Sequence, residues 1–314
     1  MSTAFIFPGQ GSQHVGMGKD FYNQYEFIYE ELFEEANDIL GVDLKNFCFS
    51  GPNDQLTATQ IAQPAIVTSS IGMYRLLKSE GITPNVVAGH SVGQFSALVA
   101  AGSLTFADAL QIVHQRGKCM AAVKKLGNMV AVVGSREEQL EEVLEKAFDF
   151  GVEMSAHNSP IQVVFSGELE KIAKFKQSVD EIPGIKTKLL NVSQAFHSSL
   201  MQEMEQEFMD YIYQFSVEDA AIPVILNCNA KVATNKNEIL EDIQLQCTRP
   251  VLWRQTIDCL STFDTTDIFE VGPSKNLSGL LRAFDLQDVV TISTESVMSY
   301  KKNMKKVKKL SLQV

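Results

Sequence analysis

The chain has 314 residues, and 45% of them are apolar, so it can bury a large core and is not a disordered segment. Its formal net charge of −11 excludes a general affinity for nucleic acid, because binding along a phosphate backbone requires clustered lysine and arginine side chains. The C-terminal end departs from this acidic composition, with six lysines between residues 301 and 309. We expect the chain to be frayed or linker-like after about residue 298, with attraction of an acidic carrier protein as the alternative.

The cysteines and the N-terminal residues indicate the compartment. The five cysteines are scattered and include no C-x-x-C pair, so neither a metal site nor a redox couple is expected. No basic leader precedes an apolar stretch, and no run of about eighteen apolar residues occurs elsewhere in the sequence. These features predict a cytoplasmic protein without a membrane partner, and we expect a monomer.

In chain order, strand-like and helical patterns alternate at the start of the sequence. Apolar runs at 3–7 and 85–90 have the length of strands, and amphipathic stretches at 19–40 and 60–79 have the length of helices. A further helical pattern follows at 105–125. This alternation predicts a parallel sheet covered by helices.

The segment 126–192 has a different pattern. Its runs follow in the order strand, helix, strand, strand, helix, strand, which is the order of a ferredoxin-like unit. Strand-like runs at 223–227 and 267–272 then resume the earlier alternation and predict completion of the first sheet. We therefore expect a large domain at 1–125 and 193–298, an inserted ferredoxin-like subdomain at 126–192, and a lysine-rich tail at 299–314.

The most informative motif is GHSVG at 89–93, which lies between a strand pattern and a helical pattern rich in small residues. A nucleophile elbow requires this context. The glycines allow a tight turn that exposes the hydroxyl of Ser91, and the amide of Val92 would then face an oxyanion. A chance occurrence of the motif in a structural turn is the alternative.

A serine nucleophile requires a base, and histidine is the commonest one. Among the five histidines, His197 follows a strand pattern and precedes a helical one, so its loop could reach the sheet edge that carries Ser91. His90 lies inside the elbow motif itself. Position alone places His197 only slightly ahead of His90, for which a structural role beneath the elbow is the alternative.

Two further segments could bind negative charge. The loop PGQGSQ at 8–13 follows the first strand, and the amide of Gln10 is a natural second donor to an oxyanion, although such a loop often forms only a turn. Arg116 lies in a helical pattern, and its planar guanidinium can bind a free carboxylate through two parallel hydrogen bonds. An exposed charge on a solvated helix face is the alternative for Arg116.

The motifs PGQGSQ, GHSVG, QRGK, NSP, QAFHS and EVGP occur in an order and spacing that closely resemble the malonyl-CoA:acyl-carrier-protein transacylases. More narrowly, they resemble the free-standing acyltransferases that serve polyketide synthases in trans. The resemblance covers about residues 3 to 285. It implies an α/β-hydrolase-like large domain with a parallel-sheet core and an inserted ferredoxin-like small subdomain.

The resemblance also implies roles for the motif residues. Ser91 would be the acylated nucleophile, His197 the general base and acid, and Arg116 the clamp for the malonyl carboxylate. Gln10 and Val92 would donate their backbone amides to the oxyanion.

Further positions follow from the same resemblance. Gln246, in QCTRPVLW, would hold the histidine in place of the aspartate of a catalytic triad. Asn158 and His90 would belong to the substrate-binding residues. Phe196 matches the HAFH pattern of malonyl-selective polyketide acyltransferases and would crowd a substituent at C2, with ordinary core packing as the alternative.

The chain departs from the family pattern GHSLGE at two positions. Val92 and Gln94 stand where the family usually has leucine and glutamate. The second change removes one charge beside the elbow, and we interpret both changes as tuning rather than as loss of function.

These residues together predict an enzyme that moves a malonyl group from malonyl-CoA to the phosphopantetheine thiol of an acyl carrier protein in fatty acid or polyketide biosynthesis. The reaction needs no bound cofactor and no metal. A proofreading acyl hydrolase is one alternative, but such relatives tend to lack the arginine at position 116. A non-catalytic docking domain is the other, and the complete set of motif residues disfavours it.

Overall fold

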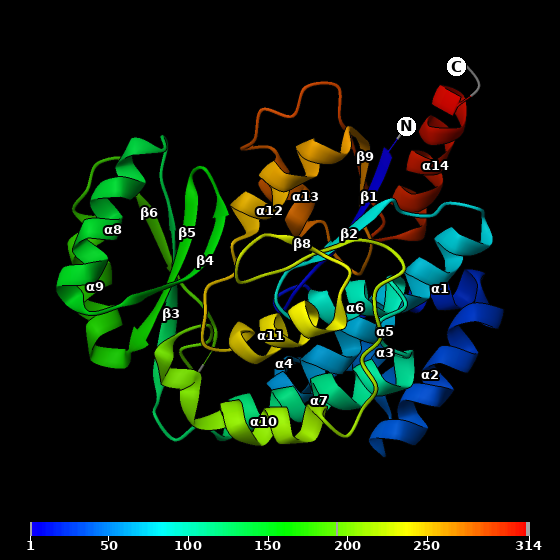
Figure 1. Cartoon of the computed structure of the whole chain (residues 1–314), viewed down its shortest axis with the longest axis horizontal. Helices are drawn as coiled ribbons and strands as arrows, with labels where there is room; N and C mark the ends of the chain where they lie inside the picture. Colours follow the sequence, from blue (N-terminus) through cyan, green and yellow to red (C-terminus); the bar gives the residue numbers. More distant parts are fainter. Residues whose placement is uncertain (1, 193, 312–314) are drawn as a thin grey trace.

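Uninterrupted apolar runs form the central strands of the larger sheet. Residues 4–7 of β1 (Ser2–Phe7) and all of β2 (Val86–Gly89) are buried, as expected for parallel strands that are covered on both faces. The computed structural model describes residues 2–192 and 194–311, and it places this sheet beside a second, smaller one (Figure 1).

The larger sheet has six strands in the order β10-β9-β1-β2-β7-β8. Neighbouring strands are parallel except β7 with β8, which are antiparallel. Phe7 pairs with Gly89, so the carboxyl ends of β1 and β2 meet at one edge of the sheet. The other strands are β7 (Val224–Ile225), β8 (Val232–Ala233), β9 (Thr265–Glu270) and β10 (Val290–Ser293).

Helix α5 (Thr59–Ser79) is the long central helix of the large domain, and most of its residues are buried. It packs against α6 (Gly93–Ala100) and α7 (Phe106–Ala122), which carry the residues that follow the elbow. The remaining helices of the large domain are α1 (Lys19–Gln24), α2 (Glu26–Leu40), α3 (Leu44–Ser50), α4 (Asn53–Thr57), α10 (Glu205–Ile212), α11 (Lys236–Gln246), α12 (Trp253–Leu260), α13 (Asn276–Leu281) and two 3-10 turns (Ser199–Met204 and Ser261–Phe263).

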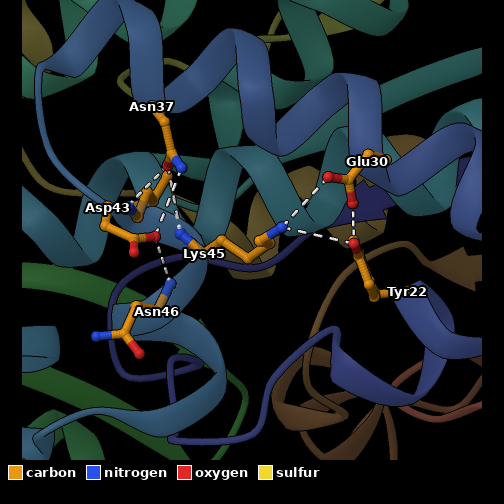
Figure 2. Close-up of polar contacts among 7 residues, drawn as sticks. Tyr22, Glu30, Asn37, Asp43, Lys45 and Asn46 are labelled. Carbon is orange, nitrogen blue, oxygen red and sulfur yellow. Dashed lines mark hydrogen bonds and ion pairs between the residues drawn. The ribbon is translucent and has the colours of Figure 1, made fainter.

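Polar contacts join the first helices of the large domain (Figure 2). The side-chain oxygen of Asn37 accepts hydrogen bonds from the amides of Leu44 and Lys45, at 2.8 and 3.4 Å. Glu30 binds Nζ of Lys45 at 3.4 Å and accepts a hydrogen bond from the hydroxyl of Tyr22. These contacts hold α1, α2 and α3 together in one corner of the domain.

The smaller sheet has the antiparallel order β4-β5-β3-β6. Helices α8 (Glu138–Phe150) and α9 (Leu169–Asp180) pack together and enclose a separate apolar cluster against the sheet, centred on Phe165 and Phe175. The strands are β3 (Gly127–Val133), β4 (Glu153–Ser159), β5 (Gln162–Glu168) and β6 (Lys186–Leu189). This arrangement confirms the predicted fold class, a parallel-sheet α/β domain with an inserted ferredoxin-like subdomain.

A short bridge joins the two sheets. Ala156 on β4 pairs with Val251, which lies just before α12 of the large domain. Val251 accepts a hydrogen bond from the amide of His157 at 2.9 Å and donates one to the carbonyl of Ser155 at 3.0 Å. The small subdomain is therefore connected to the large one by backbone pairing as well as by the chain itself.

The lysine-rich end is helical, so the prediction of a frayed or linker-like segment after about residue 298 is wrong as far as residue 311. Helix α14 (Val297–Ser311) buries Tyr300 and Met304, which lie one turn apart on the same helix face. The Tyr300 ring packs against Phe21 and Tyr25, with ring centroids 5.9 and 6.2 Å apart. The sequence pattern did not indicate this helix, because these two apolar residues stand among many lysines. Residues 312–314 of the predicted tail lie outside the described part of the chain.

Candidate active site

Ser91 lies in a sharp turn between β2 and α6, and its backbone has a left-handed conformation with φ of 52°. A Cβ atom on Gly89 would lie 2.1 Å from the carbonyl carbon of Gly93, and one on Gly93 would lie 2.2 Å from the carbonyl oxygen of Phe7. Only glycine fits at these two positions, because strand and helix approach this closely. The motif GHSVG therefore forms the strand, turn and helix that the sequence indicated.

His197 forms a hydrogen bond with Ser91, and Nε2 lies 2.8 Å from Oγ. The other ring nitrogen, Nδ1, lies 2.7 Å from the backbone carbonyl oxygen of Gln246. A carbonyl oxygen can only accept, so Nδ1 carries the proton, and Nε2 of the neutral ring accepts the hydroxyl proton of Ser91. The structure thus places the imidazole of His197, and not that of His90, at the hydroxyl of Ser91.

The ring of His197 is almost fully buried, with 5% of the residue exposed. Burial, reinforced by the nearby Arg116 cation, lowers the pKa of His197 to about 3. The imidazole is therefore neutral near pH 7 and available to accept a proton.

Arg116 is buried, with 1% of its surface exposed, which excludes a solvated charge on the face of α7. Its Nη1 donates to Oε1 of Gln63 at 2.8 Å, and its Nη2 donates to Oε1 of Gln246 at 2.9 Å. Nη2 also lies 3.3 Å from Oγ of Ser91. Within residues 2–192 and 194–311, Arg116 forms no ion pair, and its Nε has no hydrogen-bond partner.

Gln246 lies at the centre of these contacts, but the sequence did not indicate how. It holds His197 through its backbone carbonyl, while its side chain points elsewhere. The side-chain Nε2 donates to Oε1 of Gln94 at 2.8 Å and to the carbonyl of Ser91 at 3.2 Å. Backbone and side chain of one residue therefore contact the base, the nucleophile turn and the arginine.

Of the two amides expected at an oxyanion, one belongs to the elbow and the other to the loop that touches it. Val92 directly precedes α6, and Gln10 lies in the loop after β1. This loop touches the elbow, because a Cβ atom on Gly9 would lie 2.5 Å from the carbonyl oxygen of His90. Among the described backbone hydrogen bonds, neither the amide of Gln10 nor that of Val92 has a protein acceptor, so both remain available to a ligand.

His90 and Asn158 join the elbow to the small subdomain. Nε2 of His90 lies 2.8 Å from Oδ1 of Asn158 on β4, and the His90 ring packs against Trp253 at 5.4 Å. Burial lowers the pKa of His90 as well. No hydrogen bond between His90 and the hydroxyl of Ser91 occurs in the described structure, which favours the structural role beneath the elbow.

Phe196 directly precedes the base and is 6% exposed. It belongs to the apolar cluster of the large domain, and its carbonyl accepts a hydrogen bond from Ser166 at 2.7 Å. This environment fits core packing, and a role in selecting the acyl group stays a prediction.

Sequence reasoning missed three buried polar residues around the site. Asn227 accepts a hydrogen bond from the amide of Ser91 at 2.8 Å and donates to the carbonyl of Gly89 at 2.7 Å, so it holds the elbow. Asp242 and Gln63 contact the other polar residues of the site. The available signals were a polar residue at the end of the strand-like run 223–227 and a glutamine within a long apolar helix.

The described residues include no group of three or more histidine, cysteine, aspartate or glutamate side chains that could hold a metal ion. None of their helices is both long enough and apolar enough to span a membrane.

Comparison with known proteins extends over nearly the whole chain. The acyl transferase domain family matches residues 4–307. A malonyl CoA-acyl carrier protein transacylase of Bacillus subtilis (strain 168) is 39% identical over 283 residues, which cover 89% of each protein. The crystal structure of a malonyl CoA-acyl carrier protein transacylase from Clostridium perfringens matches with a TM-score of 0.92 at 32% identity, over 100% of this chain and 99% of that one. A malonyl-transacylase in complex with its type II PKS acyl-carrier protein matches with a TM-score of 0.90 at 29% identity, over 98% of this chain and 100% of that one.

Proposed function

Because the chain belongs to the acyl transferase domain family, we propose that it moves a malonyl group from malonyl-CoA to an acyl carrier protein through an ester on Ser91. The observation that carries the proposal is the convergence of two groups on one hydroxyl. Oγ of Ser91 lies 2.8 Å from the base His197 and 3.3 Å from the buried cation Arg116.

In the first half-reaction, Oγ of Ser91 attacks the thioester carbonyl while Nε2 of His197 takes the hydroxyl proton. The carbonyl oxygen becomes an oxyanion, which the free amides of Val92 and Gln10 would stabilise. The carbon–sulfur bond then breaks, the coenzyme A sulfur takes the proton from His197, and the malonyl group remains on the serine.

In the second half-reaction, the phosphopantetheine thiol of the carrier protein replaces coenzyme A. His197 takes the thiol proton, and the sulfur attacks the ester carbonyl. When the second oxyanion collapses, the carbon–oxygen bond to Ser91 breaks, and His197 returns its proton to Oγ. Donor and acceptor thus use the same base and the same amides.

Arg116 would bind the malonyl carboxylate. Its Nε is buried without a hydrogen-bond partner among the described residues, and its Nη2 reaches the nucleophile, so the guanidinium has an edge on which one donor is not used by a protein group. A planar carboxylate can bind this edge through two hydrogen bonds. Arg116 is a buried cation without a carboxylate partner among the described residues. This disfavours a hydrolase of neutral acyl groups, because a neutral acyl group would leave the charge of Arg116 unpaired.

The partner and the assembly state belong to the same proposal. A carrier protein with a phosphopantetheine arm is supported by the neighbouring structure of a malonyl-transacylase with its acyl-carrier protein. From the sequence we expect a cytoplasmic monomer without a membrane partner. Size-exclusion chromatography with light scattering tests whether the protein is a monomer.

Intact-protein mass spectrometry tests the function. After brief exposure to malonyl-CoA, the wild-type chain should carry one malonyl group that disappears when carrier protein with its arm is added. Ser91→Ala should fold normally and form no adduct, because the hydroxyl that carries the ester is gone. An adduct that is lost quickly to water without carrier would favour the acyl hydrolase, and no adduct on the wild type would favour the docking domain.

A further inference from the structure

Asp242 is a buried carboxylate outside the set of residues discussed for catalysis. It lies on α11 and is 2% exposed. Its Oδ2 accepts hydrogen bonds from Nε2 of Gln94 at 2.8 Å and from the amide of Asn227 at 3.1 Å, and its Oδ1 accepts one from the amide of Cys228 at 2.8 Å. In the described part of the chain, no cation lies within ion-pair distance of it. Burial raises the pKa of this carboxyl group, and the hydrogen bonds that it accepts from Cys228, Gln94 and Asn227 oppose that shift, so its position calls for a physical reason.

A chain of hydrogen bonds connects this carboxylate to Arg116. Nη2 of Arg116 donates to Oε1 of Gln246 at 2.9 Å, and Nε2 of Gln246 donates to Oε1 of Gln94 at 2.8 Å. Nε2 of Gln94 then donates to Asp242. Arginine can only donate and a carboxylate can only accept, so the two ends determine how both amide groups are oriented.

A second connection runs from Asp242 to the nucleophile. Asp242 accepts a hydrogen bond from the backbone of Asn227, whose side chain binds the amide of Ser91 and the carbonyl of Gly89. One carboxylate therefore supports both the turn that carries the nucleophile and the arginine beside it.

We propose that Asp242 is a positioning residue that orients Arg116 through Gln94 and Gln246, and Ser91 through Asn227. The proposal rests on the proposed function, since it assigns Arg116 to the malonyl carboxylate. A carboxylate in direct contact with Arg116 would occupy the donors that the substrate needs. Two intervening amides connect the carboxyl group to Arg116 by hydrogen bonds and leave its Nε without a partner among the described residues.

The same geometry explains the amide at position 94. A glutamate there would set a second carboxylate against Asp242 at hydrogen-bond distance, and like charges so close do not both remain ionised. Gln94 thus provides the amide donor for the hydrogen bond that Asp242 accepts. The carboxyl group that is missing beside the elbow is present on α11 instead.

The test compares malonyl and acetyl loading of Ser91 in carboxylate and amide variants. Asp242→Asn turns one acceptor into a donor that faces a donor, either the amide of Cys228 or the group formed by Gln94 and Asn227. The specificity constant for malonyl-CoA should fall about tenfold or more, and the malonyl-to-acetyl ratio should fall with it, because acetyl loading does not require Arg116. Glu241→Gln is the matched control, since Glu241 is exposed on the same helix and should leave the ratio unchanged.

The exchanged pair distinguishes positioning from a general structural role. Gln94→Glu alone should also lower the ratio, whereas Gln94→Glu combined with Asp242→Asn places acid and amide on opposite sides of the same hydrogen bond and should recover part of it. If Asp242→Asn does not fold, the malonyl-to-acetyl ratios of Gln94→Glu and of the double variant still test the proposal. A normal wild-type adduct with an unchanged ratio in the variants overturns the connection from Asp242 to Arg116, and unchanged rates of both malonyl and acetyl loading overturn the role of Asp242 altogether. Absence of the wild-type adduct overturns the proposed function.

Discussion

At the scale of single residues, we expect Arg116 to distinguish a malonyl group from neutral acyl groups. Removing one partner of a buried, hydrogen-bonded charge pair costs about 2–5 kcal/mol, or roughly thirty-fold to several-thousand-fold. Arg116→Ala should therefore lower the specificity constant for malonyl-CoA by that factor and leave acetyl loading unchanged or faster. Arg116→Lys should restore only part of it, because a point charge cannot bind a carboxylate with two parallel hydrogen bonds.

The measurement for Arg116 is the ratio of malonyl to acetyl adduct on Ser91 in the wild type and both variants. A constant ratio would mean that the buried guanidinium serves only the hydrogen bonds to Gln63 and Gln246. The acyl hydrolase would then be the better interpretation.

The pKa of His197 gives a second prediction at this scale. A base must be neutral, and the pKa of about 3 keeps His197 neutral until the solution becomes strongly acidic. Malonyl loading by the free enzyme should therefore show no inflection near pH 6.5, about the usual pKa of histidine, and should stay level down to roughly pH 5. Rapid-quench measurement of the specificity constant between pH 5 and 8 checks this, and an inflection near pH 6.5 would contradict it.

The same low pKa affects folding. Between the folded pKa and the unfolded one, the unfolded chain binds a proton that the folded chain does not. The contribution of His197 to stability is therefore complete above about pH 6.5 and is lost as the pH falls below it.

Residue identity was predictable where local sequence dictates geometry. Two glycines around a serine predicted the turn of Ser91, and a loop histidine after a strand pattern predicted the base. The contacts of Asp242 were not predictable, because Gln94 lies 148 positions away in the chain and no local pattern relates the two. For the same reason, the sequence could not show that Gln246 binds His197 through its backbone carbonyl.

At the scale of elements, the alternation of strands and helices was predictable, because buried faces give strands and helices different spacings of apolar residues. The two-residue strand β7 lies within the predicted run 223–227, whereas β8, also of two residues, is too short to give a period of its own. Helix α14 was missed because its charged residues outnumber the apolar ones that pack.

Helix α14 gives the prediction at this scale. Truncation after residue 298 removes Tyr300 and Met304 from the apolar cluster of the large domain, so the free energy of unfolding should fall by about 2–5 kcal/mol. Lys301→Gln with Lys302→Gln changes two exposed side chains on the same helix and should leave it unchanged within about 0.5 kcal/mol. Urea unfolding measures both, and equal stability of all three chains would contradict the packing of α14.

The lysine variants also address attraction of an acidic carrier. A Michaelis constant for the carrier that rises in them at low salt, and not at high salt, would support that attraction. An equal constant at low salt would leave the lysines as a solvated helix face, which the usual weakness of exposed charge pairs favours.

At the scale of the whole molecule, the bridge between Ala156 and Val251 limits how this enzyme can be recombined with its relatives. A chimera that exchanges only the small subdomain would replace Asn158 and the edge of β4, while His90 and Val251 would remain from the parent. The foreign strand would then have to match a backbone register and a histidine partner that it did not evolve with. Crossover points that carry the edge strand and the segment before α12 together preserve both, so the useful unit of recombination is discontinuous in sequence.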